Sequence, residues 1–109
     1  MSSPESAQLI ICTCPDQATA EKIAHVLVET NLAACVNCLP GTTSIFQWQG
    51  QIESVQEHLL LIKSHRSRYQ ALEAAIVANH PYEVPEIIAI SIDQGSLAYL
   101  RWINSCVSN

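Results

Sequence analysis

The fold is decided by residues 33–64, which read AACVNCLPGTTSIFQWQGQIESVQEHLLLIKS. Residues 33–49 and 51–64 both have the composition of β-strands. Gly50, which lies between them, can adopt the positive φ that a tight turn requires. The two segments are therefore predicted to form one β-hairpin, and Pro40-Gly41 is predicted to be a bend or bulge in its first strand.

This hairpin is longer than a domain of this size needs. At about 3.3 Å per residue, residues 33–49 would reach roughly 55 Å, whereas a compact chain of 109 residues has a diameter of roughly 35 Å. Unless the bend folds it back, the hairpin overshoots its own domain. The overshooting part carries Ile45, Phe46, Trp48 and Ile52. Exposed strand edges and apolar side chains seek a partner, so a neighbouring subunit is the simplest cover.

Strand and helix patterns alternate on both sides of the hairpin. Residues 9–14 are an apolar strand that stops at Pro15, and residues 17–30 repeat apolar side chains every 3.6 residues, as an amphipathic helix does. Asp16 is the predicted N-cap of that helix, and Asn31 is predicted to end it.

The segments after the hairpin complete the pattern. Residues 66–79 are predicted to be a second helix that ends before Pro81, and residues 87–92 form another apolar strand. Ser96 is predicted to cap a last helix. The order β-α-β-β-α-β predicts an α+β, ferredoxin-like fold, which is a split β-α-β with an antiparallel sheet, a long β-hairpin and an extra C-terminal helix. Residues 8–109 are expected to form this single domain, after a flexible tail over residues 1–7.

The charge of the chain excludes several classes of partner. Charged residues make up 14% of the chain, well below the usual quarter, which suggests that part of the surface is covered by another subunit. The net charge is −5 with only five basic residues, so binding to nucleic acid or to an anionic membrane surface is not expected. No apolar run is long enough to span a bilayer.

The five cysteines indicate a reducing compartment. Their number is odd and no export signal precedes them, so we expect free, mostly buried thiols and a cytoplasmic location. Cys35 and Cys38 have the C-x-x-C spacing but lie on an extended segment. Residues i and i+3 of a strand point to opposite faces, so these two are not expected to form a redox pair or a chelate.

Several segments in the same order resemble the CutA family, the divalent-cation-tolerance proteins. They are residues 32–37, 40–41, 44–50, 57–63, 80–87 and 99–102, and the resemblance runs from about Gln8 to Cys106. It implies a ferredoxin-like subunit in a homotrimer, in which the long hairpins lace neighbouring subunits together. It also implies a link to copper and other divalent metals.

Cys12, His80 and Glu86 are the predicted metal ligands. Cys12 lies near the end of the first strand, and the last strand, which follows His80 and Glu86, should run antiparallel beside it. A thiolate, an imidazole and a carboxylate form a mixed set that suits divalent copper. The resemblance also implies that these three residues surround a crevice between subunits, with Asn79 where some relatives have a second histidine.

Other readings of these residues stay open. Cys12 and Cys14 share one face of a strand, about 6.6 Å apart along it, and can pack in a core or interface as well as bind a metal. His80 can simply close the preceding helix, while Glu83 and Glu86 pair with polar groups across a subunit boundary.

The remaining polar and aromatic residues lead to simpler predictions. His25 is expected to pair with Glu21, and His58 and His65 are expected on the surface. The large aromatic side chains are expected to pack at an interface, or alternatively to line a small-ligand crevice; they are Trp48, Tyr69, Tyr82, Tyr99 and Trp102.

No phosphate-binding loop, G-x-S-x-G or H-E-x-x-H motif occurs, so the chain is not expected to be an enzyme. The first hypothesis is a soluble, trimeric, copper-binding protein of divalent-cation tolerance. One alternative is a small-molecule sensor similar to the trimeric PII proteins, although few basic residues are present to hold a nucleotide. The other is a trimeric scaffold without a ligand.

Overall fold

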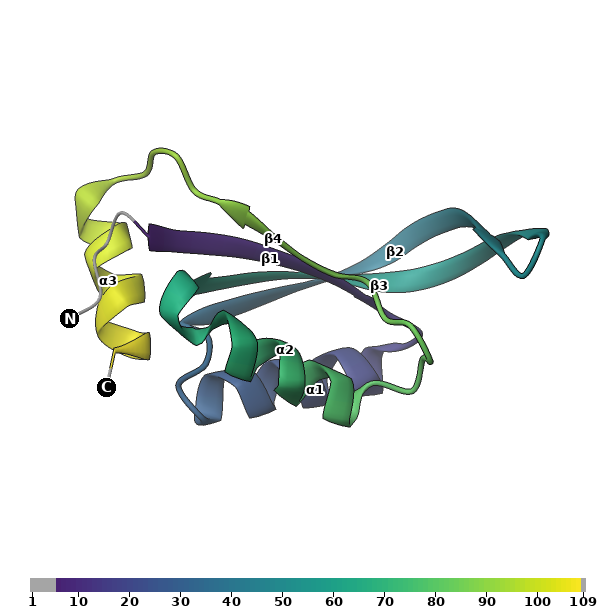
Figure 1. Cartoon of the computed structure of the whole chain (residues 1–109), viewed down its shortest axis with the longest axis horizontal. Coiled ribbons are helices and arrows are strands. Elements are labelled where there is room, and N and C mark those ends of the chain that lie inside the picture. The colour runs from purple at the N-terminus through teal and green to yellow at the C-terminus, as the bar shows by residue number, and fades with distance from the viewer. Residues whose placement is uncertain (1–5, 109) are drawn as a thin grey trace.

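The computed structural model describes residues 6–108, which fold into one four-stranded sheet with helices packed against it (Figure 1). The elements in chain order are β1 (Ala7–Cys14), α1 (Gln17–Glu29), β2 (Cys35–Trp48), β3 (Gln51–His65), the short 3-10 helix η2 (Arg66–Arg68), α2 (Tyr69–Asn79), β4 (Ile87–Ser91) and α3 (Leu97–Val107). This order confirms the α+β, ferredoxin-like pattern with an additional C-terminal helix.

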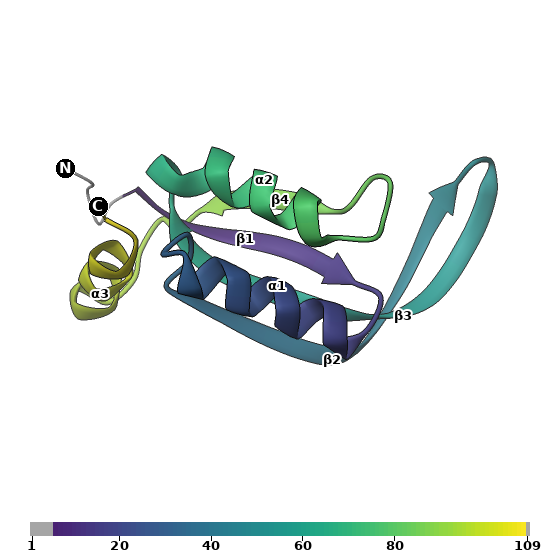
Figure 2. The same cartoon turned by 90° about the horizontal axis from the view of Figure 1, so that it is seen from below.

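The sheet is antiparallel throughout, with the strand order β2-β3-β1-β4. Helices α1 and α2 lie side by side across one face, and α3 packs at the end of the sheet away from the hairpin tip (Figure 2). The main core lies between the sheet and α1 and α2. Its largest fully buried side chains are Ile10, Ile23, Leu27, Leu60, Ile62, Leu72 and Ile76.

The predicted ends of α1 and the predicted start of α3 are confirmed. The Asp16 side chain accepts a hydrogen bond of 2.8 Å from the Thr19 N–H, which satisfies one of the unpaired amides at the start of α1. Asn31 follows the last turn with φ 59°, a left-handed conformation that asparagine tolerates better than most residues. The Ser96 hydroxyl accepts from the Tyr99 N–H at 3.2 Å and begins α3.

The hairpin projects from the sheet as an arm, which comprises the distal parts of β2 and β3. The pairing register shifts between Leu39 and Thr42, so the predicted bulge lies at Pro40-Gly41, where Gly41 has φ 77°. At the tip, Gln49 and Gly50 have φ values of 50° and 79°, as a two-residue hairpin turn requires. The arm makes the molecule 45 Å long against 25 and 22 Å in the other directions.

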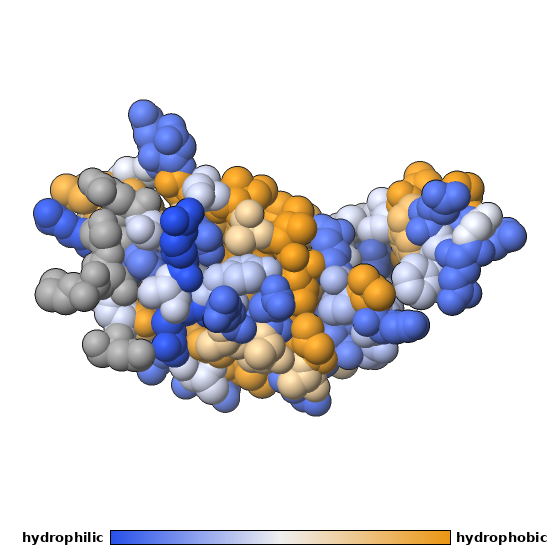
Figure 3. Space-filling view, viewed as in Figure 1, coloured by the Kyte–Doolittle hydropathy of each residue, from blue (hydrophilic) through white to orange (hydrophobic). Residues whose placement is uncertain are grey.

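The face of the sheet opposite α1 and α2, called here the open face, is apolar. Register pairs Leu9 with Ile90 and Ile11 with Ile88, and the two isoleucines of β4 are 48% and 50% exposed. Hydrophobic side chains gather in a band across the middle of the molecule and again on the arm (Figure 3). Within residues 6–108, no helix is both long enough and apolar enough to cross a membrane.

Some local predictions are wrong. Ala7, expected in the tail, is 2% exposed and starts β1, because its carbonyl accepts from the Ile92 N–H at 3.1 Å; residues 1–5 of the expected tail lie outside the described residues. The second helix starts with a 3-10 turn, so α2 proper begins only at Tyr69. That turn is capped by His65, whose Nδ1 accepts from the Ser67 N–H at 3.0 Å. His65 is therefore buried and not a surface residue.

Two further corrections concern helix α1 and the cysteines. His25 lies 3.3 Å from Glu29, one turn later, and not against Glu21, which accepts from Gln17 instead. All five cysteines are free, but only Cys12 and Cys14 are buried. The expectation of mostly buried thiols is therefore correct for these two alone.

Candidate metal centre

Strand β1 places two thiols in the core. Cys12 and Cys14 alternate with Thr13, so both side chains point toward the helices and both are fully buried. Cys12 is paired on one side with Leu60 of β3 and on the other with Ile87 of β4. The strand alternation thus holds the two sulfur atoms on one side of the central strand.

His80 approaches the same place from the end of α2. It is the C-cap of that helix, with an extended backbone, because the following Pro81 disfavours helical geometry at this position. Its Nδ1 accepts a hydrogen bond of 3.2 Å from the Tyr82 N–H. Nδ1 is therefore unprotonated, and Nε2 carries the hydrogen that it donates to the Thr13 carbonyl oxygen at 2.8 Å.

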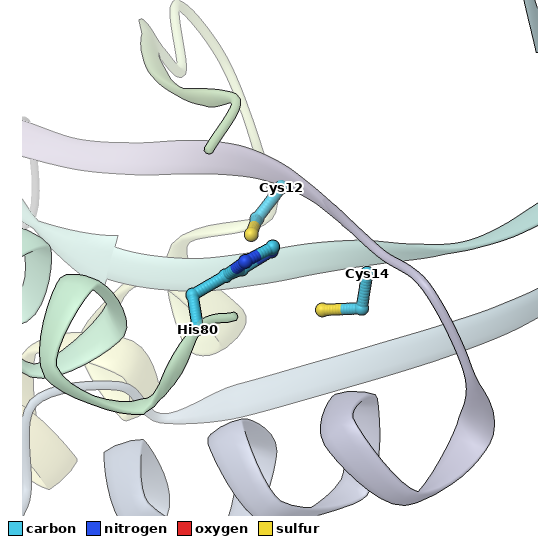
Figure 4. Close-up of side chains that lie close together, drawn as sticks. All are labelled: Cys12, Cys14 and His80. Carbon is cyan, nitrogen blue, oxygen red and sulfur yellow. The ribbon is translucent and has the colours of Figure 1, made fainter. Parts of the chain in front are cut away.

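The three side chains converge. One ligand atom each from Cys12, Cys14 and His80 lies within 4.8 Å of the others, with the imidazole facing both thiols (Figure 4). Ligands of a tetrahedral zinc ion would lie about 3.5–3.8 Å apart. The donor atoms must therefore move together by about an ångström, which small rotations of the side chains can supply.

The pKa values of the two thiols are shifted in opposite directions. A hydrogen bond with Cys14 raises the pKa of Cys12, and burial and the negative charges of Cys14, Glu86 and Glu57 raise it further. The same hydrogen bond lowers the pKa of Cys14, because the Cys12 S–H stabilises a thiolate there. Cys14 is therefore the thiol of the pair that loses its proton first, which makes it the stronger metal ligand.

The structure brings together only part of the predicted ligand set. Cys12 and His80 belong to the donor cluster, but Glu86 does not, since its exposed side chain lies with Thr13 beyond the opposite side of β1. Cys14 takes its place, and the i, i+2 spacing of the two cysteines was the signal for it. His80 also closes helix α2, as the simpler reading expected.

Two other residues of the predicted loop region stay apart from the cluster. Asn79 donates to the Ala75 carbonyl at 2.8 Å within α2, and Glu83 is exposed. Cys35 is half-buried and Cys38 is exposed.

Comparison with known proteins gives a consistent picture over nearly the whole chain. The family model "CutA1 divalent ion tolerance protein" matches residues 8–106. A divalent-cation tolerance protein CutA of Pectobacterium atrosepticum is 43% identical over 99 residues, which is 91% of this chain and 90% of the relative. The human protein CutA is 44% identical over 92% of this chain, which spans 56% of the human protein.

A solved structure agrees with these relationships. The crystal structure of CutA from Xylella fastidiosa superposes with a TM-score of 0.92 at 46% identity, covering 94% of this chain and 99% of that one. Sequence, fold and extent of the match therefore agree, and this chain belongs to the CutA1 family of divalent ion tolerance proteins.

Proposed function

We propose that this protein binds a divalent metal, with copper as the metal, through Cys12, Cys14 and His80. The observation that carries this proposal is the convergence of their three donor atoms within 4.8 Å. Thiolate and imidazole are the donors that copper and zinc prefer, and copper is the strongest binder of the divalent series. Membership of a divalent ion tolerance family supports a relation to such metals.

Glu86 was expected to be a metal ligand, but in this proposal it contributes only its negative charge. Its negative charge acts on Cys12, so it favours a bound cation from beyond the strand without contributing a ligand atom. The proposed function is the binding of a metal ion by two buried thiols and an imidazole.

The open face supports an assembly of several subunits, and we take the number three, a homotrimer, from the resemblance to the CutA family. Ile88 and Ile90 are about half exposed, and an apolar sheet face of this kind is stable when another subunit covers it. The arm carries Ile45 and Ile52, at 71% and 73% exposure, which a neighbour would also cover. Light scattering on dilute protein should give three times the 12.0 kDa mass of one chain.

The five free thiols among the described residues also support a cytoplasmic location, since a reducing compartment keeps thiols unpaired. A nucleotide-sensing function is less well supported. The cavity between the arm and the loop after α2 is lined by Glu57 and Glu86 and by no lysine or arginine, whereas phosphates require positive charge or clustered amides.

Calorimetric titration of copper and zinc tests the metal proposal. Cys12→Ser, Cys14→Ser and His80→Ala should each weaken binding by roughly tenfold or more, as the loss of one ligand does. Glu86→Gln should have a smaller effect. Cys38→Ser, which changes an exposed thiol outside the cluster, is the matched control. Equal affinities in wild type and in the three ligand variants would place the metal elsewhere.

A further inference from the structure

The candidate metal centre lies inside the protein, so a metal ion needs a route to it. Cys12 and Cys14 are 0% exposed and His80 is 9% exposed. On the side of the loop after α2, the Tyr82 ring packs against the His80 ring, with centroids 4.7 Å apart. An ion that crosses apolar packing must lose its hydration shell, which is costly. A donor group between the solvent and the cysteines would lower that cost.

His58 of β3 lies in such a position. The register pairs it directly with Cys14 of β1, and directly opposite residues of antiparallel strands share one face, with Cβ atoms about 4.5–5.5 Å apart. His58 therefore lies beside the cysteine on the helix-covered face of the sheet, and not on the open face. Cys14 is fully buried, whereas His58 is only half-buried. The histidine thus connects the buried thiol with the solvent.

The hairpin bulge leaves His58 unpaired on its other side. Strand β2 pairs with Leu59 and with Glu57, but its register shifts at Pro40-Gly41, so among residues 6–108 no residue of β2 pairs with His58. A bulge bends its strand and interrupts the ladder locally. His58 consequently has a paired neighbour on the side of the cysteines and none on the side of the edge strand.

The ring of His58 is also free to bind a ligand. The rings of the other three histidines are all occupied in hydrogen bonds; they are those of His25, His65 and His80. In the described part of the chain, His58 alone has a ring without a hydrogen-bond partner. A neutral imidazole keeps one unprotonated nitrogen, and neutral imidazole is the commonest metal ligand among side chains.

A carboxylate lies at the solvent end of this route. Asp16 is exposed and follows Cys14 by two residues. Hydrogen bonds from Thr19 lower the pKa of Asp16, and the charge of His58 lowers it further, so the carboxylate and the imidazole lie within electrostatic reach of each other. Negative charge at the entrance of a site attracts cations and raises their rate of encounter.

We propose that His58 carries metal ions from the solvent into the buried centre, an inference that rests on the proposed metal binding. The ion first binds the free nitrogen of His58, beside Asp16. The bond to that nitrogen then breaks as the bond to the Cys14 sulfur forms, and the thiol proton passes to water. Because His58 is no ligand of the final site, it changes the rates of entry and exit by the same factor and leaves the affinity unchanged.

The kinetics of cobalt(II) uptake test this route. Cobalt is a divalent ion of the same series, and its bond to a thiolate absorbs light. It is mixed rapidly with the metal-free full chain, and its release is started with a chelator. His58→Ala should slow both uptake and release by roughly tenfold or more, with an unchanged equilibrium affinity. His25→Ala, at an exposed histidine of α1 outside the route, is the matched control and should keep the wild-type rates.

A second pair of variants separates donor chemistry from shape. His58→Phe keeps a ring of similar size but has no donor atom, so its uptake should be as slow as that of His58→Ala. His58→Cys is smaller but offers a sulfur that soft metals prefer, so it should restore fast uptake. A purely structural role of the histidine would give the opposite order, with phenylalanine as the better substitute.

Several results would overturn the proposal. Uptake by His58→Ala at the wild-type rate would mean that ions enter elsewhere, and faster uptake would mean that His58 obstructs the way. A weaker affinity with an unchanged rate of uptake would make His58 a ligand of the site itself. Cys14→Ser should lose the thiolate absorption. A wild-type protein without that absorption would contradict the metal centre and the route together, whereas normal absorption with unaltered rates in His58→Ala would contradict the route alone.

Discussion

The Nε2 atom of His80 lies 2.8 Å from the carbonyl oxygen of Thr13, and this contact ties the end of α2 to the end of β1. Thr13 separates the two buried cysteines, so the strand that supplies the thiols also fixes the imidazole against them. Binding of a metal through Nε2 would displace this hydrogen bond. The His80 contact is thus a structural link of the metal-free protein as well as a feature of its candidate metal centre.

Removal of this link should destabilise the metal-free protein. His80→Ala leaves the Thr13 carbonyl with only the weak Cys12 S–H, 3.8 Å away, as a side-chain donor. The loss of the stronger partner of a buried polar group costs about 1–3 kcal/mol. Urea unfolding in the presence of a chelator measures the free energy of unfolding. His25→Ala, at an exposed position of α1, should change that free energy by less than about 0.5 kcal/mol. Equal stabilities of the two variants would show that the contact contributes nothing.

Metal binding should release protons. The raised pKa of Cys12 means that this thiol keeps its proton at neutral pH and must lose it to coordinate a metal. The affinity should therefore fall as the pH decreases, and calorimetry in buffers of different ionisation enthalpy should report proton release. In Cys12→Ser, which lacks this thiol, metal binding should release fewer protons. A metal affinity independent of pH would argue against thiolate coordination.

The Asp16 cap should make stability depend on pH in acid. The hydrogen bonds from Thr19 hold the pKa of Asp16 below its ordinary value of 3.8. The charged carboxylate therefore stabilises the fold above about pH 4, and this contribution is lost as the pH falls through the lowered pKa of the folded state. Melting temperatures of wild type and Asp16→Ala should differ at neutral pH and converge in acid. A difference that persists at low pH would mean that the charge plays no part.

The open face should govern assembly. Ile88→Glu places a charge among the apolar side chains of β4, 50% exposed in the single subunit. If a neighbour covers this face, burial of that charge should weaken assembly by about 2 kcal/mol or more. Val77→Glu on α2, at 54% exposure, adds the same charge away from the open face. Light scattering should show a loss of mass for Ile88→Glu alone; identical masses would place the subunit contacts elsewhere.

The local elements could be predicted because their signals are local. The turn at Gly50, the bulge at Pro40-Gly41 and the cap at Asp16 each depend on the conformational preference of one or two residues. His65 shows the limit of such reasoning. A histidine at the end of a strand resembles a surface residue, and only the adjacent 3-10 turn, which it caps, accounts for its burial.

The sequence predicted the candidate site only in part. The antiparallel pairing of β1 with β4, and hence the nearness of Cys12 to the loop that starts at His80, followed from the order of elements. The order of elements did not predict on which face of the sheet each of these residues lies. Glu86 was expected to be a metal ligand with Cys12, but it lines a cavity together with Thr13 and is not part of the donor cluster.

The sequence by itself determined the order of strands and helices, the long hairpin and the family, because these depend on periodicity and on short motifs. Only the tertiary structure decided that Cys14 joins Cys12 and His80, and that Glu57 is buried against Tyr82. Both depend on side chains brought together from distant positions, 67 residues apart for His80 and Thr13 and 25 for Tyr82 and Glu57. Such contacts are set by strand register and by the length and packing of α2, which no local pattern encodes.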